Sequence, residues 1–206
     1  MEINQKKADV QDFNRRAATY ENSRRQSIIF DHVQRTVLDL AKNANKPESI
    51  LDVGCGTGRL LRKAKEHWPD ARLIGVDPAE GMIQQAIQLV SGAEFHVAIA
   101  ESLPLPDASV DLVFSTLSFH HWSSQAKGVS EITRVLRLQG RFLLADIVMP
   151  YGLSLVVRHF KRNNPVRMRE MFAEAGLDVE LQQRRWRWSR FLVVTAGKKA
   201  LMTKVS

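Results

Sequence analysis

Three glycines at alternate positions carry the strongest chemical signal in the sequence. Gly54, Gly56 and Gly58 follow Asp52, between an apolar segment typical of a buried strand and a segment typical of a helix. Because glycine has no Cβ, such a loop can turn tightly and let a ligand approach its backbone N–H groups. The loop therefore predicts a binding site at the end of a strand.

A second acidic residue stands where it can join this site. Asp77 ends the next apolar segment, 19 residues after Gly58. One helix and one turn bring the chain back to the neighbouring strand, so we expect Asp77 beside the glycine loop. A carboxylate there can accept hydrogen bonds from both hydroxyls of a ribose. Together these features indicate a site for an adenosine-containing ligand.

The spacing of the glycines bears on which ligand is bound. Nicotinamide and flavin dinucleotides prefer the pattern G-x-G-x-x-G. Here the third glycine comes one residue early, and Arg59 occupies the position that it would fill. The spacing therefore disfavours a nucleotide-dependent oxidoreductase, which we keep as an alternative.

Alternating strand and helix patterns must position these residues. Apolar segments predict strands at 49–53, 72–76, 94–97, 110–115, 141–147, 179–185 and 186–196, and helical spacing is found at 22–43, 59–68, 79–90, 125–138 and 165–175. Strands that alternate with helices predict a parallel sheet covered on both faces. The last two strands have little chain between them and must pair antiparallel if they pair. We therefore expect an α/β fold with a doubly wound, Rossmann-like, mostly parallel seven-stranded sheet and one antiparallel strand near the C-terminus.

Length and composition limit the class of protein. We expect the 206 residues to form a single domain. The one cysteine, Cys55, excludes a disulfide framework and a multi-cysteine zinc site. No apolar run approaches the ~18 residues of a membrane-spanning helix, and the first residues lack a signal-peptide core. We expect a soluble, cytoplasmic protein.

The positive charge is concentrated in the last quarter of the chain. Residues 1–40 carry a net charge of +1, residues 41–150 carry −1 and residues 151–206 carry +8. Such an asymmetry can attract nucleic acid or an anionic membrane, or can form a solvated face. The stretch 184–190 alternates arginine with tryptophan, and 152–160 is an apolar run followed by basic residues. Contact with nucleic acid is possible but not favoured, and peripheral contact with a membrane is possible.

The glycine loop and its surroundings resemble the class I S-adenosylmethionine-dependent methyltransferases, in particular the "type 11" group that includes quinone-biosynthesis C-methyltransferases. The resemblance runs from about 13 to 140, and more loosely to 196. It implies S-adenosylmethionine as the cofactor, with the three glycines under its methionine part and Asp52 on its amino group. It also implies Asp77 on the ribose and Pro78 and Met82 against the adenine.

Further motifs of the family are matched along the chain. Residues 98–104 resemble its third motif, usually G-D-A-E-x-L-P, with Ile99 in place of the acid that binds the adenine amino group. The backbone N–H of Ala100 or the side chain of Glu101 would then serve. Residues 115–122 resemble the segment that lines cofactor and acceptor, which implies contacts from Ser115 and Leu117.

The resemblance also assigns a lid and the residues nearest the acceptor. Residues 13–20 resemble a helix that covers the cofactor, and Tyr20 or Phe119 could face its sulfonium through a cation–π contact. His120 is a candidate base near the acceptor, and with His121 alone beside it we expect no metal site. Within the domain 1–206 we expect a helical lid at 1–45, a cofactor-binding core at 46–150, and the acceptor side with the C-terminal strands at 151–206.

These observations predict methyl transfer from S-adenosylmethionine to a small-molecule acceptor by in-line displacement. Such a reaction mainly needs alignment and exclusion of water. A base is needed only if the acceptor must lose a proton. The alternatives are an RNA methyltransferase that uses the basic last quarter, and a non-catalytic S-adenosylmethionine-binding protein.

Overall fold

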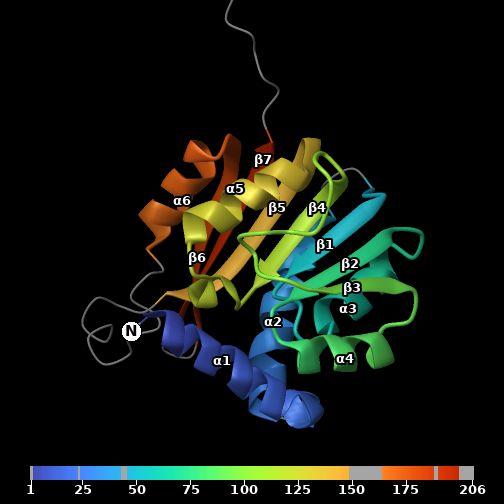
Figure 1. Cartoon of the computed structure of the whole chain (residues 1–206). Helices are drawn as coiled ribbons and strands as arrows, with labels where there is room; N and C mark the ends of the chain where they lie inside the picture. Colours follow the sequence, from blue (N-terminus) through green and yellow to red (C-terminus); the bar gives the residue numbers. More distant parts are fainter. Residues whose placement is uncertain (1, 23, 43–45, 149–163, 188–189, 200–206) are drawn as a thin grey trace, which may run out of the picture.

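A seven-stranded sheet forms the centre of the molecule (Figure 1). The computed structural model describes residues 2–22, 24–42, 46–148, 164–187 and 190–199. The strand order is β3-β2-β1-β4-β5-β7-β6. The strands are β1 Ser49–Val53, β2 Arg72–Asp77, β3 Ala93–Val97, β4 Val110–Thr116, β5 Leu136–Val148, β6 Leu177–Arg187 and β7 Arg190–Lys199.

The direction of the strands follows the predicted pattern. Strands β1 to β5 pair in parallel with one another, whereas β7 pairs antiparallel with both β5 and β6. Thus β7 is the one reversed strand of this sheet, and the predicted fold class is confirmed. The first strand of the last hairpin was predicted to end at 185 and the second to begin at 186. In the structure β6 ends at Arg187 and β7 begins at Arg190, which pairs with Arg187.

Helices cover both faces of the sheet. On one face, α5 (Gln125–Val135) and α6 (Pro165–Glu174) bury Ile132 and Phe172 against strand residues such as Val113 and Phe142. On the other face, α2 (Arg24–Ala41) and α3 (Arg59–His67) pack Val37 and Leu61 against residues such as Phe114 and Leu143. Alternate residues of β4 and β5 thus enter opposite cores, as expected of strands with both faces covered.

One predicted helix boundary was wrong. Residues 125–138 have helical spacing, but α5 ends at Val135 and Leu136 already pairs with Val110 in the sheet. Leu136 is fully buried, whereas Leu138 is 57% exposed. The sheet therefore takes over at Leu136, because its burial between β4 and the helices outweighs the helical periodicity of the next residues.

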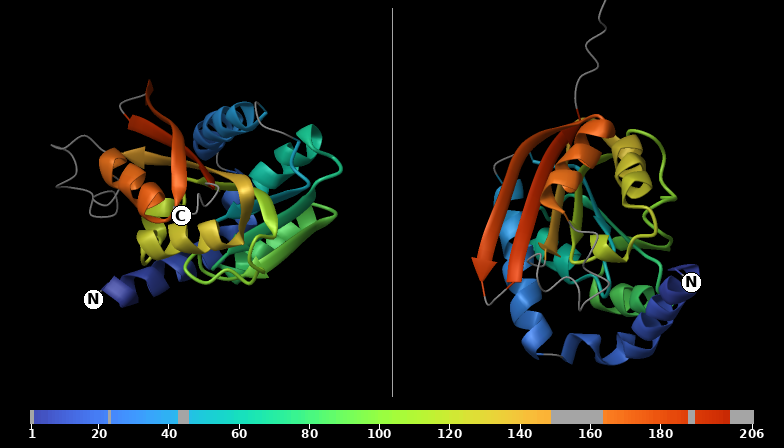
Figure 2. Two further views of the ribbon diagram at one scale, coloured as in Figure 1. Left: turned by 90° about the horizontal axis from the view of Figure 1, so that it is seen from above. Right: turned by 90° about the vertical axis from the view of Figure 1, so that its left-hand side faces the viewer.

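The N-terminal helices curve around one end of the sheet (Figure 2). They are α1 (Glu2–Arg16), the 3-10 turn η1 (Ala17–Asn22) and α2. The side-chain oxygen Oδ1 of Asn14 accepts a hydrogen bond of 2.7 Å from the backbone N–H of Gly81, in α4 (Glu80–Leu89). Glu21 accepts from the hydroxyl of Thr57 in the glycine loop. These bonds hold the N-terminal segment against the loops at the ends of β1 and β2.

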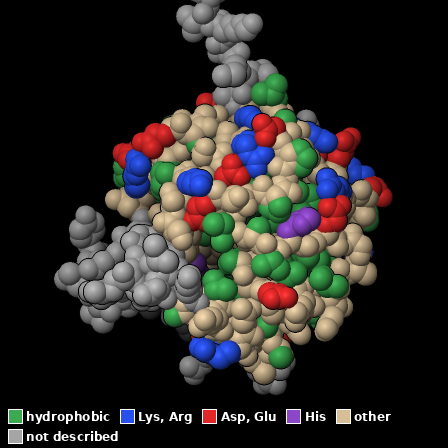
Figure 3. Space-filling model, in the orientation of Figure 1, with side chains coloured by type: hydrophobic (Ala, Val, Ile, Leu, Met, Phe, Trp, Pro, Cys, Tyr) green, Lys and Arg blue, Asp and Glu red, His purple; other side chains and the backbone are tan. Residues whose placement is uncertain are grey.

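The charged side chains are mixed on the face seen in Figure 3, where basic and acidic groups are interspersed. The stretch 152–160, considered for membrane contact, lies outside the described residues, as do the side chains of 184–190, considered for nucleic acid. In the described part of the chain, no helix combines the length and the apolar character needed to cross a bilayer.

Candidate active site

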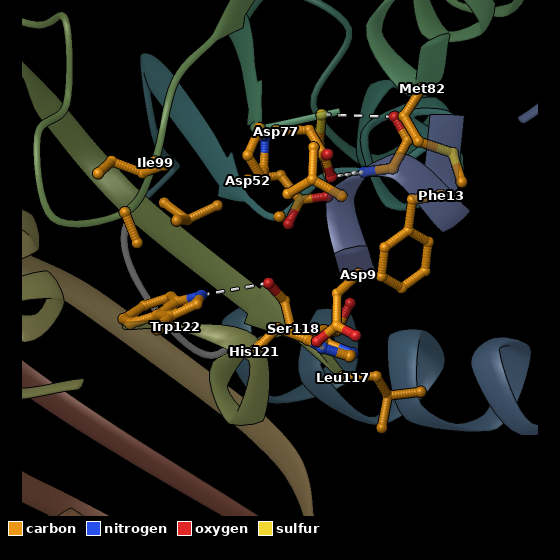
Figure 4. A pocket seen from close by; sticks show the side chains of 18 of the residues that line it. Asp9, Phe13, Asp52, Asp77, Met82, Ile99, Leu117, Ser118, His121 and Trp122 are labelled. Atoms are coloured by element: carbon orange, nitrogen blue, oxygen red, sulfur yellow. Dashed lines mark hydrogen bonds and ion pairs between the residues drawn. The ribbon is translucent and has the colours of Figure 1, made fainter. Parts of the chain in front are cut away.

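A cavity of about 580 Å³ lies where the ends of β1, β2, β3 and β4 meet the N-terminal helices (Figure 4). Its walls come from the glycine loop, the segments after β2, β3 and β4, and α1, η1 and α2. The residues discussed below that line it are Asp9, Phe13, Tyr20, Phe30, Asp52, Gly54, Gly56, Thr57, Arg59, Asp77, Pro78, Met82, Ile99, Ala100, Glu101, Thr116, Leu117, Ser118, His121 and Trp122.

The three glycines of the loop have different tasks. Gly54 has φ +78°, and a Cβ there would stand 1.9 Å from Oγ of Ser118, so the loop can approach the segment after β4 only without a side chain. Gly56 has φ +53°, and a Cβ there would meet nothing within 4 Å. The approach of a ligand to the loop at Gly56 is therefore open.

Gly58 does not line the cavity, unlike the other two glycines. A Cβ on it would stand 2.7 Å from Cγ2 of Val90, just beyond α4. Its φ of +77° lets α3 begin close to the end of α4. The geometry thus gives Gly58 a packing role, and its contact with the cofactor stays a prediction.

Asp52 is a buried carboxyl group that faces the cavity. Its side chain is 2% exposed, and its Oδ1 has no hydrogen-bond partner among the described residues. Burial, reinforced by the nearby charge of Asp77, raises the pKa of Asp52 to about 8. A buried carboxyl without a partner is unfavourable unless a cation or a donor reaches it. This is the property expected of a residue that binds an ammonium group.

Asp77 ties the end of β2 to the glycine loop. Its Oδ2 accepts the backbone N–H of Gly56 at 2.9 Å, and its Oδ1 accepts that of Ala79 at 2.9 Å. Burial raises the pKa of Asp77, and these two hydrogen bonds oppose that rise. A carboxylate has about four acceptor sites, so each oxygen can also accept a hydrogen bond from a hydroxyl group of a ligand.

The residues predicted beside an adenine also line the cavity. Pro78 and Met82 follow β2, and Ala100 and Glu101 follow β3. Oε1 of Glu101 accepts the backbone N–H of Ser124 at 2.7 Å, which fixes this carboxylate in place. Ile99 lines the cavity as well, with 49% of its surface exposed.

The end of β4 and the turn that follows it contribute Thr116, Leu117 and Ser118, but not Ser115. Ser115 is fully buried within β4, opposite Leu144 of β5, and this explains why it does not reach the cavity. Leu117 has φ +55°, a conformation that leucine rarely adopts. Its N–H donates to the carbonyl of Ala145 at 2.8 Å, which holds the turn toward the cavity.

The rings of the two adjacent histidines lie against each other, with centroids 4.0 Å apart, but they have different partners. They belong to the 3-10 turn η2 (Phe119–His121), in which successive side chains are about 120° apart. Nδ1 of His120 lies 2.9 and 3.0 Å from the two carboxylate oxygens of Asp146, which is fully buried in β5. His121, and not His120, lines the cavity. The role of His120 as a candidate base near the acceptor stays a prediction that this lining does not support.

His121 stands between the lid and the core. Its Nδ1 is 3.6 Å from Oδ2 of Asp9, and the Phe13 ring meets its ring edge-on at a centroid distance of 5.3 Å. Burial, together with the neighbouring His120, lowers the pKa of His121 to about 4. The imidazole is therefore neutral at neutral pH.

Aromatic rings of the N-terminal helices form another wall of the cavity. Tyr20 packs edge-on against Phe13 at 6.2 Å and against Phe30 at 6.1 Å. Burial raises the pKa of the Tyr20 phenol above its usual value, so the ring stays uncharged. Uncharged aromatic rings suit the neighbourhood of a sulfonium cation.

Sequence reasoning missed the lining residues Asp9 and Phe30, and within the segment 115–122 it did not single out Thr116 or Trp122. A signal for Asp9 was present, because it lies four positions before Phe13 and thus on the same face of a helix. The choice between His120 and His121 depends on the 3-10 turn, which the sequence pattern does not indicate.

An open, doubly wound sheet with its cavity at the carboxyl ends of β1 and β4, a G-x-G-x-G loop and an acid after β2 defines the class: the Rossmann-like fold of class I S-adenosylmethionine-dependent methyltransferases. Residues 51–144 match the family model described as "Methyltransferase domain". The resemblance found in the sequence is confirmed over this segment, and the match supports S-adenosylmethionine as the cofactor.

Named relatives agree with this assignment. The chain is 38% identical over 104 residues to a malonyl-[acyl-carrier protein] O-methyltransferase of Hahella chejuensis, covering 50% of this chain and 37% of the relative. It is 31% identical over 117 residues to a demethylmenaquinone methyltransferase of Thermotoga maritima, covering 57% and 51%. The chain thus spans about half or less of the length of these curated relatives.

A solved structure shares the fold over almost the whole chain. It contains a putative methyltransferase in complex with the Haloferax volcanii Trm112 methyltransferase activator. The TM-score is 0.76 at 22% identity, over 92% of this chain and 98% of the other. The likeness shows the common fold.

Proposed function

We propose that this protein transfers a methyl group from S-adenosylmethionine to a small-molecule acceptor. The observation that carries the proposal is the carboxyl group of Asp52, buried in the cavity wall with an oxygen that lacks a partner among the described residues. The ammonium group of a methionine moiety is the kind of partner that such an oxygen requires.

The other walls fit the rest of the cofactor. The open approach at Gly56 suits the methionine chain, and Asp77 suits the ribose hydroxyls. Pro78 and Met82 supply apolar contact for the adenine, near Ala100 and Glu101. When bound, the cofactor supplies an activated methyl group on a sulfonium.

The chain's own contribution is alignment and exclusion of water. Phe13, Tyr20 and Phe30 close the cavity from the side of the N-terminal helices and keep uncharged surface near the sulfonium. In-line displacement then requires the acceptor to be held on the far side of the methyl group. His121 takes the place proposed for His120 beside the acceptor, and Tyr20 is assigned to the sulfonium side.

The remaining expectations belong to the same proposal. The division into a lid at 1–45, a core at 46–150 and an acceptor side at 151–206 stays a prediction, as does a cytoplasmic location. The mixed charges of the face in Figure 3 give no added support to an RNA substrate.

Calorimetric titration with S-adenosylhomocysteine tests the cofactor, with NADH and NADPH as controls. We expect micromolar binding of the first and none of the nicotinamides. Binding of a nicotinamide instead, or no binding at all, would overturn the proposal. Incubation with methyl-labelled S-adenosylmethionine and a small-molecule extract then separates an enzyme, which leaves labelled product, from a protein that only binds the cofactor.

A further inference from the structure

Four carboxylates line the cavity, and three of them have partners or a proposed task. Glu101 accepts the N–H of Ser124, and Asp52 and Asp77 face the proposed cofactor. The fourth, Asp9, has no task in the cofactor site. Among the described lining residues Arg59 is the one permanent cation, and its guanidinium lies 3.2 Å from Glu21, with which it is paired.

Asp9 stands apart from the two cofactor acids. Figure 4 shows its carboxylate beside the ring of His121 and separate from Asp52 and Asp77. It comes from α1, one helical turn before Phe13, and its side chain is 27% exposed. A partly buried carboxylate attracts a cation more strongly than one in open water, because screening by solvent is weaker there.

The nearest described basic group does not neutralise this charge. His121 approaches Asp9 to 3.6 Å, but its ring is also packed against the ring of His120, at a centroid distance of 4.0 Å, and against Phe13. His120 in turn forms a hydrogen bond with Asp146, with 2.9 Å between Nδ1 and Oδ1. Because the His121 imidazole is neutral at neutral pH, the carboxylate keeps its net charge.

We propose that Asp9 binds a cationic group of the methyl acceptor and thereby selects amine-bearing acceptors over carboxylates and phosphates. Apolar contact comes from Phe13 and Leu117, and His121 offers a neutral polar wall next to the ammonium. The inference rests on the proposed function, because Asp52 and Asp77 line the same cavity and are occupied only when the cofactor is bound.

The test is binding of three matched probes to protein saturated with S-adenosylhomocysteine. Benzylamine, benzyl alcohol and benzoate share one ring and differ in charge at neutral pH. We expect benzylamine to bind at least fivefold more tightly than benzyl alcohol, and benzoate to bind more weakly than both. In Asp9→Asn the preference for the amine is expected to fall below twofold.

A matched control is available on the same helix. Asp12 pairs with Arg15 and Arg16, is 46% exposed and does not line the cavity. Asp12→Asn removes the same charge from α1 and is expected to keep the full preference for benzylamine. A general effect of net charge would lower the preference equally in both variants and would overturn the inference.

The remaining outcomes are also decisive. Equal binding of amine and alcohol, tighter binding of benzoate, or no binding of any probe to the S-adenosylhomocysteine complex would overturn the role of Asp9 and leave the cofactor site intact. Failure of S-adenosylhomocysteine itself to bind would instead overturn the proposed function, so the two failures are distinguishable.

Discussion

The backbone N–H of Gly56 donates a hydrogen bond of 2.9 Å to the carboxylate of Asp77, across 21 positions of sequence. This bond joins the glycine loop after β1 to the acid at the end of β2. Asp77 thus shapes the loop as well as offering oxygens to a ligand.

Replacing Asp77 by alanine is expected to weaken the binding of S-adenosylhomocysteine more than tenfold. The variant loses the acceptors for the ribose and leaves the N–H groups of Gly56 and Ala79 without their partner. Calorimetric titration measures the change. An affinity close to that of the parent protein would show that Asp77 does not contact the cofactor.

Asp52→Asn is expected to change stability and binding in opposite directions. The folded-state pKa of Asp52 is raised from 3.8 to about 8, so the folded protein holds this proton longer than the unfolded chain. This group therefore costs no stability below its unfolded-state pKa, and the free energy of unfolding falls as the pH rises from there toward its folded-state pKa. At pH 8 the unliganded variant should be more stable by on the order of 5 kcal/mol, since the shift spans about four pKa units and one unit corresponds to about 1.4 kcal/mol.

Urea unfolding between pH 5 and 8 without ligand measures this difference, and the same variant should bind S-adenosylhomocysteine more than tenfold more weakly. Parallel stability curves for the two proteins over that range would contradict the assigned burial of an unpartnered carboxyl group.

The two neighbouring histidines are expected to differ in their effect on folding. His120→Ala removes the imidazole that bonds both oxygens of the buried Asp146, and should lower the free energy of unfolding by about 1–3 kcal/mol. His121→Ala, at the cavity wall, should lower it by less than about 1 kcal/mol. Urea titrations of both variants make the comparison, and a larger loss for His121→Ala would reverse the assignment.

Glu21 is expected to hold the N-terminal helices closed. Burial would raise the pKa of Glu21, but hydrogen bonds from Thr57 and Arg59 keep it below 4.5. A carboxyl group with a lowered pKa stabilises the fold at a pH above its unfolded-state pKa, and this stabilisation is lost as the pH falls through its folded-state pKa. Glu21→Gln should therefore speed hydrogen exchange of the amides of residues 8–22 about fivefold at neutral pH. Unchanged exchange in these amides, or equally faster exchange in β1, would contradict this role.

The motif-bearing residues could be predicted because their positions depend on short-range order. Asp52, Gly54 and Gly56 lie within five consecutive residues between a strand and a helix, so the fold class alone brings them to the cavity. Asp77 follows from the next parallel strand in the same way. The order of strands and helices along the chain is thus enough to place these residues at the cavity.

The site predictions that the cavity lining does not support depend on details of one residue. Ser115 and Thr116 are adjacent in β4, and the alternation of a strand decides which of them faces the cavity. Gly58 resembles Gly56 in sequence but packs against α4. The partners of His120 lie in β5, 26 positions away, and no local pattern points to them.

The bond between Asn14 and Gly81 spans 67 positions, and that between Glu21 and Thr57 spans 36. On the ribosome, α1 and η1 therefore emerge well before the groups that they contact. While β1, β2 and α4 are still being synthesised, these helices lack the groups that they contact in the folded protein. The helices that cover the cavity are thus made before the glycine loop and α4, and they can reach their final positions only when those elements are complete.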